Sequence, residues 1–167
     1  MKQKIILGLT IMLWLVKVNA QTLDVQFNTT PLTKGDSLKS YNIVVWVEDE
    51  YGKFISTLLV YADNKKQLVK WYSKTTGSTG NAITGGTLST AKKHYIDWDC
   101  RKFNGAFISL GKYKLCLESS SVGEAETYHE VPISIFYKAY EIKRDDLTFF
   151  PNLVISFTPI TVTGKSK

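Results

Sequence analysis

Two cysteines are the side chains of this sequence with the most direct route to chemistry. Cys100 and Cys116 are the only cysteines, and two thiols in a chain with an export leader favour a disulfide. A bridge closing so short a loop would contribute about 3 kcal/mol to stability. Tyr113 and Leu115 are expected on the inward face of one strand, so Cys116 falls on the outer face and Cys100 would have to reach it. Two free thiols are the alternative. Because free exported thiols would be reactive, we expect the bridge.

The two histidines and the nearby acids do not form a recognisable catalytic or metal-binding pattern. His94 and His129 have no second ligand at zinc spacing, and the chain has no HExxH or paired CxxC motif. We expect both rings at the surface or at a strand edge, and the acids Glu124, Glu126 and Glu130 on a solvated loop. The sequence also lacks a Gly-x-Ser-x-Gly elbow and a phosphate-binding glycine loop. We therefore expect a protein that is not an enzyme and that has no metal site.

The first twenty residues, MKQKIILGLTIMLWLVKVNA, have the layout of a secretory signal peptide. Lys2 and Lys4 precede an apolar run, and small Ala20 ends the segment. The apolar run over 5–16 is shorter than the roughly twenty residues that span a bilayer. A buried N-terminal helix is the alternative. We expect cleavage after Ala20 and a periplasmic or secreted product with no membrane span.

Removing this leader changes what length and charge imply. The leader carries three lysines and no acid, so the formal charge falls from +6 to +3. A nearly balanced domain gives no reason to expect nucleic-acid binding. Residues 21–167 are about the length of one domain.

The apolar segments that must position any site mostly have the alternation of β-strands. In 41–48, Ile43, Val45 and Val47 share one face while Val44 and Trp46 share the other, so we expect burial on both sides. A polar turn ending in Gly52 joins this strand to the next. The expected strands are 22–28, 41–48, 54–61, 95–98, 113–118, 131–136 and 152–160.

One segment differs from this pattern. Residues 64–73 place Leu68, Trp71 and Tyr72 at helical spacing behind a capping Asn64, which predicts a short helix. The following residues, 74–90, are rich in Gly, Ser and Thr and are expected to form a loop. We predict an all-β, immunoglobulin-like antiparallel β-sandwich with one short inserted helix.

The strongest motif in the sequence is structural. Residues 98–113 read WDCRKFNGAFISLGKY. Trp98 offers a large ring to the core, Gly105 and Gly111 permit positive φ angles, and Tyr113 is expected to be buried with its hydroxyl on nearby backbone. The segment resembles the corner of flagellar-hook-capping immunoglobulin-like domains, whose pattern is matched by Trp98, Asp99, Gly105, Gly111 and Tyr113. Three positions depart from it: Cys100 stands where glycine is usual, Lys102 where an acid is usual, and Ser109 where proline is usual.

A wider resemblance covers about two-thirds of the mature chain. IVVWVEDEYGKFISTLL, the Trp-bearing helix, the Gly/Thr loop and KYKLCLE look like the family of predicted periplasmic proteins called domain of unknown function 2271. Residues 44–60 and 98–118 carry the match best. The resemblance implies partners such as a flavin transferase or a membrane reductase.

The same resemblance implies a cofactor loop. In that family the loop before the corner often reads Asp-x-x-Ser/Thr-Gly-Ala-Thr, similar to the site where exported flavin transferases esterify FMN to threonine. The matching residues here are Asn81, Thr84, Gly85, Gly86 and Thr87, with Thr87 as the attachment residue. Asn81 replaces the acid and Gly86 replaces alanine. A flexible, unmodified loop is the alternative.

Together these patterns predict an exported, non-catalytic accessory or binding module associated with an extracytoplasmic flavin or electron-transfer system. Two alternatives stay open. The first is a redox carrier with FMN on Thr87. The second is a carbohydrate- or ligand-binding module that uses exposed rings among Trp46, Trp71, Tyr72 and Trp98.

Overall fold

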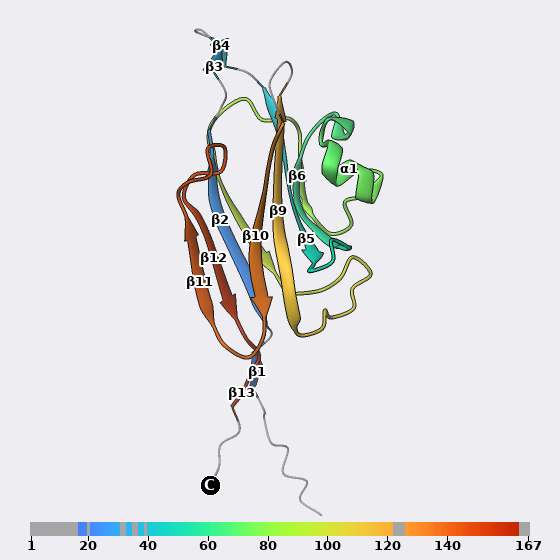
Figure 1. Ribbon diagram of the computed structural model, residues 1–167, viewed down its shortest axis with the longest axis vertical. Coiled ribbons are helices and arrows are strands. Elements are labelled where there is room, and N and C mark those ends of the chain that lie inside the picture. The colour runs from blue at the N-terminus through green and yellow to red at the C-terminus, as the bar shows by residue number, and fades with distance from the viewer. Residues whose placement is uncertain are drawn as a thin grey trace, which may run out of the picture.

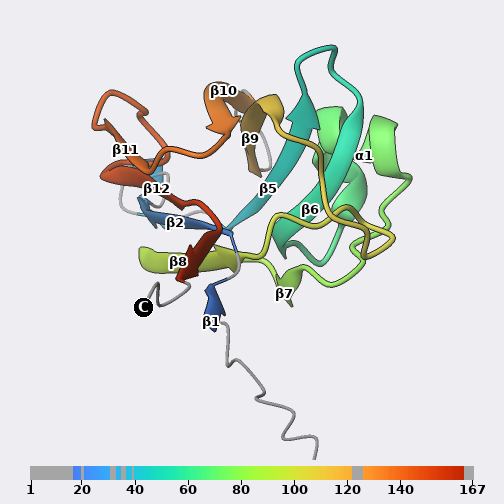
Figure 2. The ribbon, with the colours of Figure 1, turned by 90° about the horizontal axis from the view of Figure 1, so that it is seen from below.

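The chain folds as two facing β-sheets, shown in the computed structural model of Figures 1 and 2. The structure describes residues 17–19, 21–30, 33–34, 37–38, 40–121 and 126–163. One sheet has five strands in the order β10-β9-β5-β6-β7: β5 (Tyr41–Asp49), β6 (Phe54–Tyr61), β7 (Ile83–Gly85), β9 (Gly111–Ser121) and β10 (Thr127–Ile135). The other has four in the order β11-β12-β2-β8: β2 (Thr22–Thr29), β8 (Lys92–Trp98), β11 (Tyr140–Arg144) and β12 (Leu153–Thr158). The predicted all-β sandwich is confirmed.

Strand β5 is buried on both faces, as its sequence predicted. Ile43, Val45 and Val47 lie in the core between the sheets. Val44 and Trp46 belong to a second cluster on the outer face of the five-stranded sheet. Strand β5 pairs with β6 on one side and with β9 on the other, so it is the central strand and has no solvent-facing side.

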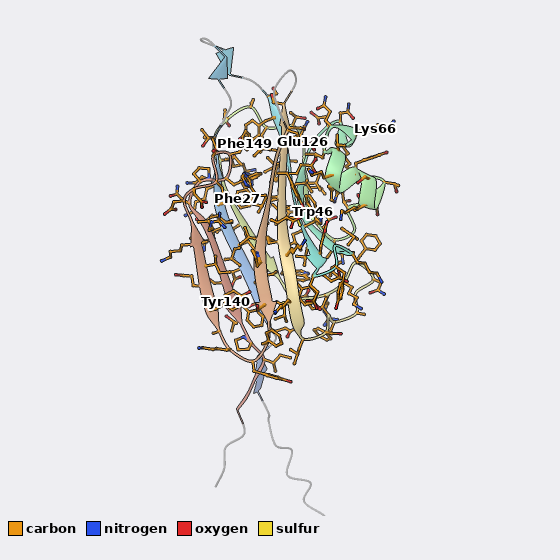
Figure 3. The ribbon with its side chains drawn as sticks, in the orientation of Figure 1. Phe27, Trp46, Lys66, Glu126, Tyr140 and Phe149 are labelled. Atoms are coloured by element: carbon orange, nitrogen blue, oxygen red, sulfur yellow. The ribbon has the colours of Figure 1, made fainter. Side chains whose placement is uncertain are left out.

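The second cluster is buried because a short helix covers it. The predicted helix over 64–73 is present in two pieces, a 3₁₀ turn η1 (Lys65–Gln67) and helix α1 (Val69–Thr75). The side chain of Asn64 caps the 3₁₀ turn by accepting from the backbone N–H of Lys66. Trp71 of α1 is fully buried against the sheet. Figure 1 shows α1 on the outside of β5 and β6, and Figure 3 places Trp46 beneath it.

The predicted strands differ from the observed ones mainly at their ends and where a segment is short. Strand β11 was not predicted, and the expected loop over 74–90 contains β7, which pairs with β6 in parallel. Periodicity misses both because strands of three to five residues show too few alternations. Two minor pairs complete the described chain: β1 (Lys17–Asn19) with β13 (Thr161–Thr163), and β3 (Thr33–Lys34) with β4 (Ser37–Leu38).

The predicted leader is mostly outside the described residues. Positions 1–16 and 20 are not described, while 17–19 form β1. Cleavage after Ala20 would therefore remove β1 and leave β13 without this partner.

The registers place the connections of both sheets at two opposite ends of the sandwich. Trp98 pairs with Leu23, Asp49 with Tyr113, and Ile135 with Gly111. The loops over 50–53, 99–110 and 136–139 and residues 159–160 are therefore together at one end, the lower end in Figure 1, beside β1 and β13. Helix α1 and the loop over 145–152 are nearer the opposite end.

Candidate functional site

The predicted cofactor loop lies at the edge of the five-stranded sheet. Asn81 and Thr84 are exposed, and Thr84 belongs to β7. Gly85 ends β7, and Thr87 is half-buried two residues further on. The structure thus brings the predicted site residues to one edge of the sheet. Asn81 and Thr84 are exposed there, whereas Thr87 is half-buried.

The hydroxyl of Thr87 is held by two hydrogen bonds. Its Oγ1 accepts from the backbone N–H of Asp63 at 3.0 Å and donates to Oδ1 of Asn42 at 2.8 Å. The backbone N–H of Thr87 donates to Oδ2 of Asp63 at 3.3 Å. These contacts fix the loop to β5 and to the segment after β6. An FMN ester on Thr87 would remove the donated hydrogen bond and place a phosphate anion beside the Asp63 carboxylate.

Gly85 and Gly86 of this loop lie close to neighbouring side chains. A Cβ on Gly85 would meet the ring of Tyr61 at 2.4 Å, and a Cβ on Gly86 would meet Oδ1 of Asp63 at 3.0 Å. A Cβ at position 85 would overlap the Tyr61 ring, so this position needs glycine, whereas a Cβ at position 86 would require only a small shift of the Asp63 carboxylate. Asp63 and Asn42 were not predicted as part of this site, because they lie 24 and 45 residues from Thr87.

The corner over 98–113 forms largely as predicted. Trp98 is buried, and its Nε1 donates to the carbonyl of Arg101 at 2.9 Å. Gly105 has φ +81°. Tyr113 is buried, and its hydroxyl donates to the carbonyl of Ser109 at 2.7 Å, which pins the corner. The prediction for Gly111 was wrong: it is the first residue of β9 and is not among the positive-φ residues.

Cys100 has a backbone conformation that is typical of glycine. Its φ is +56°, in the left-handed region that favours glycine. The side chain is buried in the core between the sheets. Asp99, the residue before it, is exposed, and its Oδ2 accepts from Nε of Arg101 at 2.8 Å.

The expected disulfide is absent, and both cysteines are free. Cys116 is on the outer face of its strand, as predicted, but that face is covered and the thiol lies in the cluster beneath α1. Cys100 lies in the other cluster, between the sheets, so β9 and its neighbours separate the two sulfurs. Burial raises the pKa of both thiols to about 12, which keeps them protonated and unreactive.

His94 lies on the edge strand β8 of the four-stranded sheet, one of the two predicted places, but it is buried and not exposed. Strand β8 begins at Lys92, earlier than expected, and its alternation turns His94 inward with Ile96 and Trp98. The ring stacks on Phe27 at 4.8 Å. His129 is half-buried, and its buried Nε2 has no hydrogen-bond partner among the described residues.

The tryptophans do not form a sugar-binding platform. Trp46 and Trp71 are fully buried and Trp98 is 6% exposed. A carbohydrate platform needs exposed, coplanar rings, and the three tryptophans named for it are part of the core.

A cleft opens where the two sheets meet at β6 and β8. Its volume is about 410 Å³, within the range of small ligand sites. Leu58 of β6 and Ile96 of β8 are among its buried apolar residues. The other lining residues come from β6, β8, the β7 loop and the corner: Ser56, Thr57, Asn81, Ile83, Asp97, Trp98, Asp99, Arg101, Lys102, Phe103 and Gly105.

The aromatic wall of this cleft is held in position. The backbone N–H of Phe103 donates to the carbonyl of Ile55 at 2.9 Å, and its ring packs on Phe54 with centroids 6.4 Å apart. Gly80 has φ +57°, and a Cβ there would meet the Phe103 ring at 2.7 Å. The ring is still 48% exposed, so it can contact a bound molecule.

The rim of the cleft carries both signs of charge. The guanidinium of Arg101 binds Asp99, donates to the carbonyl of Gly105 at 2.9 Å and stacks on Phe107 at 3.8 Å. Asp97 and Lys102 are exposed at the same cleft. An apolar floor, a fixed aromatic wall and a mixed rim suit a partner that has both apolar and polar groups. Sequence patterns gave no signal for this cleft.

The buried carboxylates outside the cleft hold helix α1. Glu118 of β9 accepts from the backbone N–H groups of Lys70 and Trp71 at 3.0 and 2.9 Å. Glu48 accepts from Nε1 of Trp46 at 2.7 Å and pairs with Lys74 at 2.8 Å. Burial, with a nearby Glu126, raises the pKa of Glu118. These groups bind both ends of the helix to the sheet.

The described part of the chain was compared with membrane-spanning helices and metal sites, and the chain with known proteins. Within the described residues no helix is long and apolar enough to span a bilayer, and no three His, Cys, Asp or Glu side chains gather as a metal site. No curated protein and no solved structure matches the chain. A family model described as "Predicted periplasmic protein (DUF2271)" matches residues 22–144. This range includes the loop predicted to carry a cofactor, the corner and the cleft. The chain belongs to this family of predicted periplasmic proteins.

Proposed function

We propose that this protein is an exported, non-catalytic binding module of an extracytoplasmic flavin or electron-transfer system. The observation that carries the proposal is the cleft between β6 and β8, which combines the exposed Phe103 ring with Asp97 and Lys102 on its rim. The link to a flavin transferase or a membrane reductase comes from the family resemblance. The cleft is where such a partner would bind.

A non-catalytic role agrees with how the ionisable groups are used. Glu48 and Glu118 hold helix α1, and His94 is packed between aromatic rings. Both thiols are protonated in the core. Groups with such structural contacts are poorly placed to act on a substrate.

Site-specific photo-crosslinking tests the binding role. A benzoylphenylalanine replaces Lys102 on the cleft rim, and the protein is irradiated with membranes of its source organism. We expect an adduct whose second chain is identified by peptide mass spectrometry as a flavin transferase or a membrane reductase. The matched control carries the probe at Lys66, an exposed lysine near α1, away from the cleft (Figure 3). Adducts with neither class of protein, or the same adducts from both positions, would contradict the proposal.

The second candidate function is a redox carrier with FMN esterified to Thr87. The observation in its favour is that the loop lies at an exposed sheet edge with Thr84 in solvent. In this reaction the Thr87 Oγ1 bonds to the FMN phosphorus of FAD, the phosphoanhydride breaks, AMP leaves and the hydroxyl proton goes to solvent. The hydrogen bonds of Thr87 to Asp63 and Asn42 would have to open first.

Intact mass of the exported protein, co-produced with a flavin transferase, tests this candidate. The carrier role requires a mass gain of one FMN less one water, lost in Thr87→Ala and kept in Thr84→Ala. Loss of the adduct in Thr84→Ala alone would move the attachment to the exposed threonine. No adduct on the parent protein would exclude the carrier role.

A further inference from the structure

The cleft between β6 and β8 is bordered by a free sheet edge. Among the described residues, β8 is the last strand of the four-stranded sheet and pairs only with β2. Figure 2 shows β8 at the edge of its sheet. In an antiparallel pair, the N–H and C=O groups of alternate residues point away from the partner strand. Because Ile96, Asp97 and Trp98 end β8 and line the cleft, this part of the free edge is open to another extended chain.

The opposite wall of the cleft offers an apolar contact. Thr57 and Leu59 of β6 pair with consecutive residues of β5, so Leu58 between them is the extra residue of a β-bulge. As a result Leu58 and Leu59 both lie in the core between the sheets, although they are neighbours in a strand. Leu58 lines the cleft together with the exposed ring of Phe103. A chain laid along β8 would place the side chains of one of its faces against these two residues.

Two acids lie opposite each other at this edge. Asp97 of β8 is the register partner of Asp24 of β2. Neither carboxylate forms an ion pair with another described residue. Burial, and secondarily the charge of Asp97, raise the pKa of Asp24. Like charges directly opposite on neighbouring strands are destabilising, so a cation beside Asp97 would relieve this repulsion.

The two faces of β8 determine which side chains an added strand needs. Ile96 and Trp98 are buried, whereas Asp97 between them is exposed on the other face. Side chains of paired strands lie opposite one another on the same face. A basic residue opposite Asp97 would therefore have its two neighbours directed into the cleft, where apolar side chains suit Leu58. A neutral or acidic residue opposite Asp97 would leave the repulsion in place, so the edge discriminates among strands.

We propose that the free edge of β8 binds an extended segment of a partner protein by strand addition, and that this segment carries a lysine or arginine opposite Asp97 between two apolar residues. The backbone of the segment pairs with β8 at Ile96–Trp98, and its apolar side chains pack on Leu58 and Phe103. The inference rests on the proposed binding role of the cleft and adds the chemistry of the segment that enters it.

Selection from a peptide library tests the proposal. The exported protein is immobilised and panned against random heptapeptides displayed on phage, and we expect enriched sequences with a basic residue between two apolar ones. A labelled synthetic peptide of the enriched sequence is then measured by fluorescence anisotropy. N-methylation of the alternate amides that face β8 should weaken its binding about tenfold, because it removes the donors of the strand pairing. N-methylation of the other set, which points away from β8, should change the binding little.

A charge reversal tests the role of Asp97. Asp97→Lys is expected to weaken the binding of this peptide about tenfold and to favour a peptide with glutamate in place of the basic residue. The matched control is Glu141→Lys, the same kind of change at an exposed position of β11, the other edge strand of this sheet. It should bind like the parent, and far-UV circular dichroism verifies that both variants are folded.

Four results would overturn strand addition at this edge. They are no enriched peptide, enriched sequences without a basic residue, equal effects of the two N-methylated sets, and equal effects of the two variants. The failure of strand addition is distinguishable from the failure of the proposed function. Crosslinking of a flavin transferase or a membrane reductase from Lys102 with no enriched peptide would exclude strand addition alone. Peptide binding lost in Asp97→Lys without such a crosslink would exclude the proposed partners and retain the strand site.

Discussion

Replacing Trp71 by alanine is expected to lower the free energy of unfolding by about 3–5 kcal/mol and to release helix α1 from the sheet. Trp71 is fully buried in the cluster with Val44 and Trp46. Its Nε1 donates to Oγ1 of Thr57 at 2.9 Å, and its backbone N–H donates to Glu118 at 2.9 Å. Truncation therefore leaves a large cavity and an unsatisfied hydroxyl, in a helix too short to persist alone.

Two further variants separate the causes of this loss. Trp71→Phe keeps most of the apolar contact and loses the hydrogen bond to Thr57, so we expect a loss of about 1–2 kcal/mol. Val69→Ala, on the same helix but 57% exposed, should change stability by about 0.5 kcal/mol or less. Urea unfolding followed by far-UV circular dichroism measures all three. A Trp71→Ala protein no less stable than Val69→Ala would show that α1 does not hold the outer cluster together.

Acidification is expected to destabilise the fold through His94. The ring is 3% exposed, stacks on Phe27 and has Nε2 3.3 Å from Oγ1 of Thr29. Burial, and secondarily the charge of Lys92, lower the pKa of His94 from 6.5 to about 4. The unfolded chain therefore binds the proton more readily than the folded one. The stability from this group is complete above pH 6.5 and is lost as the pH falls toward 4.

The expected size of the effect is about 2 kcal/mol between about pH 7.5 and about pH 5. Other groups titrate in this range too, and the buried Glu118, whose pKa is raised, acts in the opposite direction. The His94 contribution is therefore the difference between the parent protein and His94→Gln, both unfolded in urea at each pH. The variant should lose less stability than the parent by this amount.

The second histidine provides the control for this experiment. Burial also lowers the pKa of the half-buried His129, so His129→Gln should flatten the pH dependence less than His94→Gln does. Parent and His94→Gln curves with the same slope would show that His94 is not held neutral by the fold.

The features that the sequence predicted well depend on local patterns. The two-sided burial of β5 follows from the alternation in 41–48, and the corner follows from Trp98, Gly105 and Tyr113 within sixteen residues. In each case the interacting residues are close in the chain, or the residues of one strand face recur at a fixed spacing. The positive φ of Cys100, +56°, was not predicted, although the residue stands where the corner pattern has glycine.

The features that the sequence could not predict join distant segments. Asp63 and Asn42 meet Thr87 only because β5, β6 and the β7 loop fold together. The disulfide prediction failed because the outer face of β9 is covered by α1, while Cys100 turns into the other core. The cleft between β6 and β8 exists only after two sheets are in place.

The sequence by itself therefore determined the layers: a β-sandwich with one short helix, a pinned corner and an N-terminal leader pattern. It could do so because strand alternation, caps and positive-φ positions are local in the chain. Only the tertiary structure decided which buried face each cysteine and His94 occupies, what Thr87 is bonded to, and that Asp97 lies opposite Asp24 at the free edge of β8. Those outcomes depend on which strands become neighbours, and the pairing of distant strands has no local pattern in the sequence.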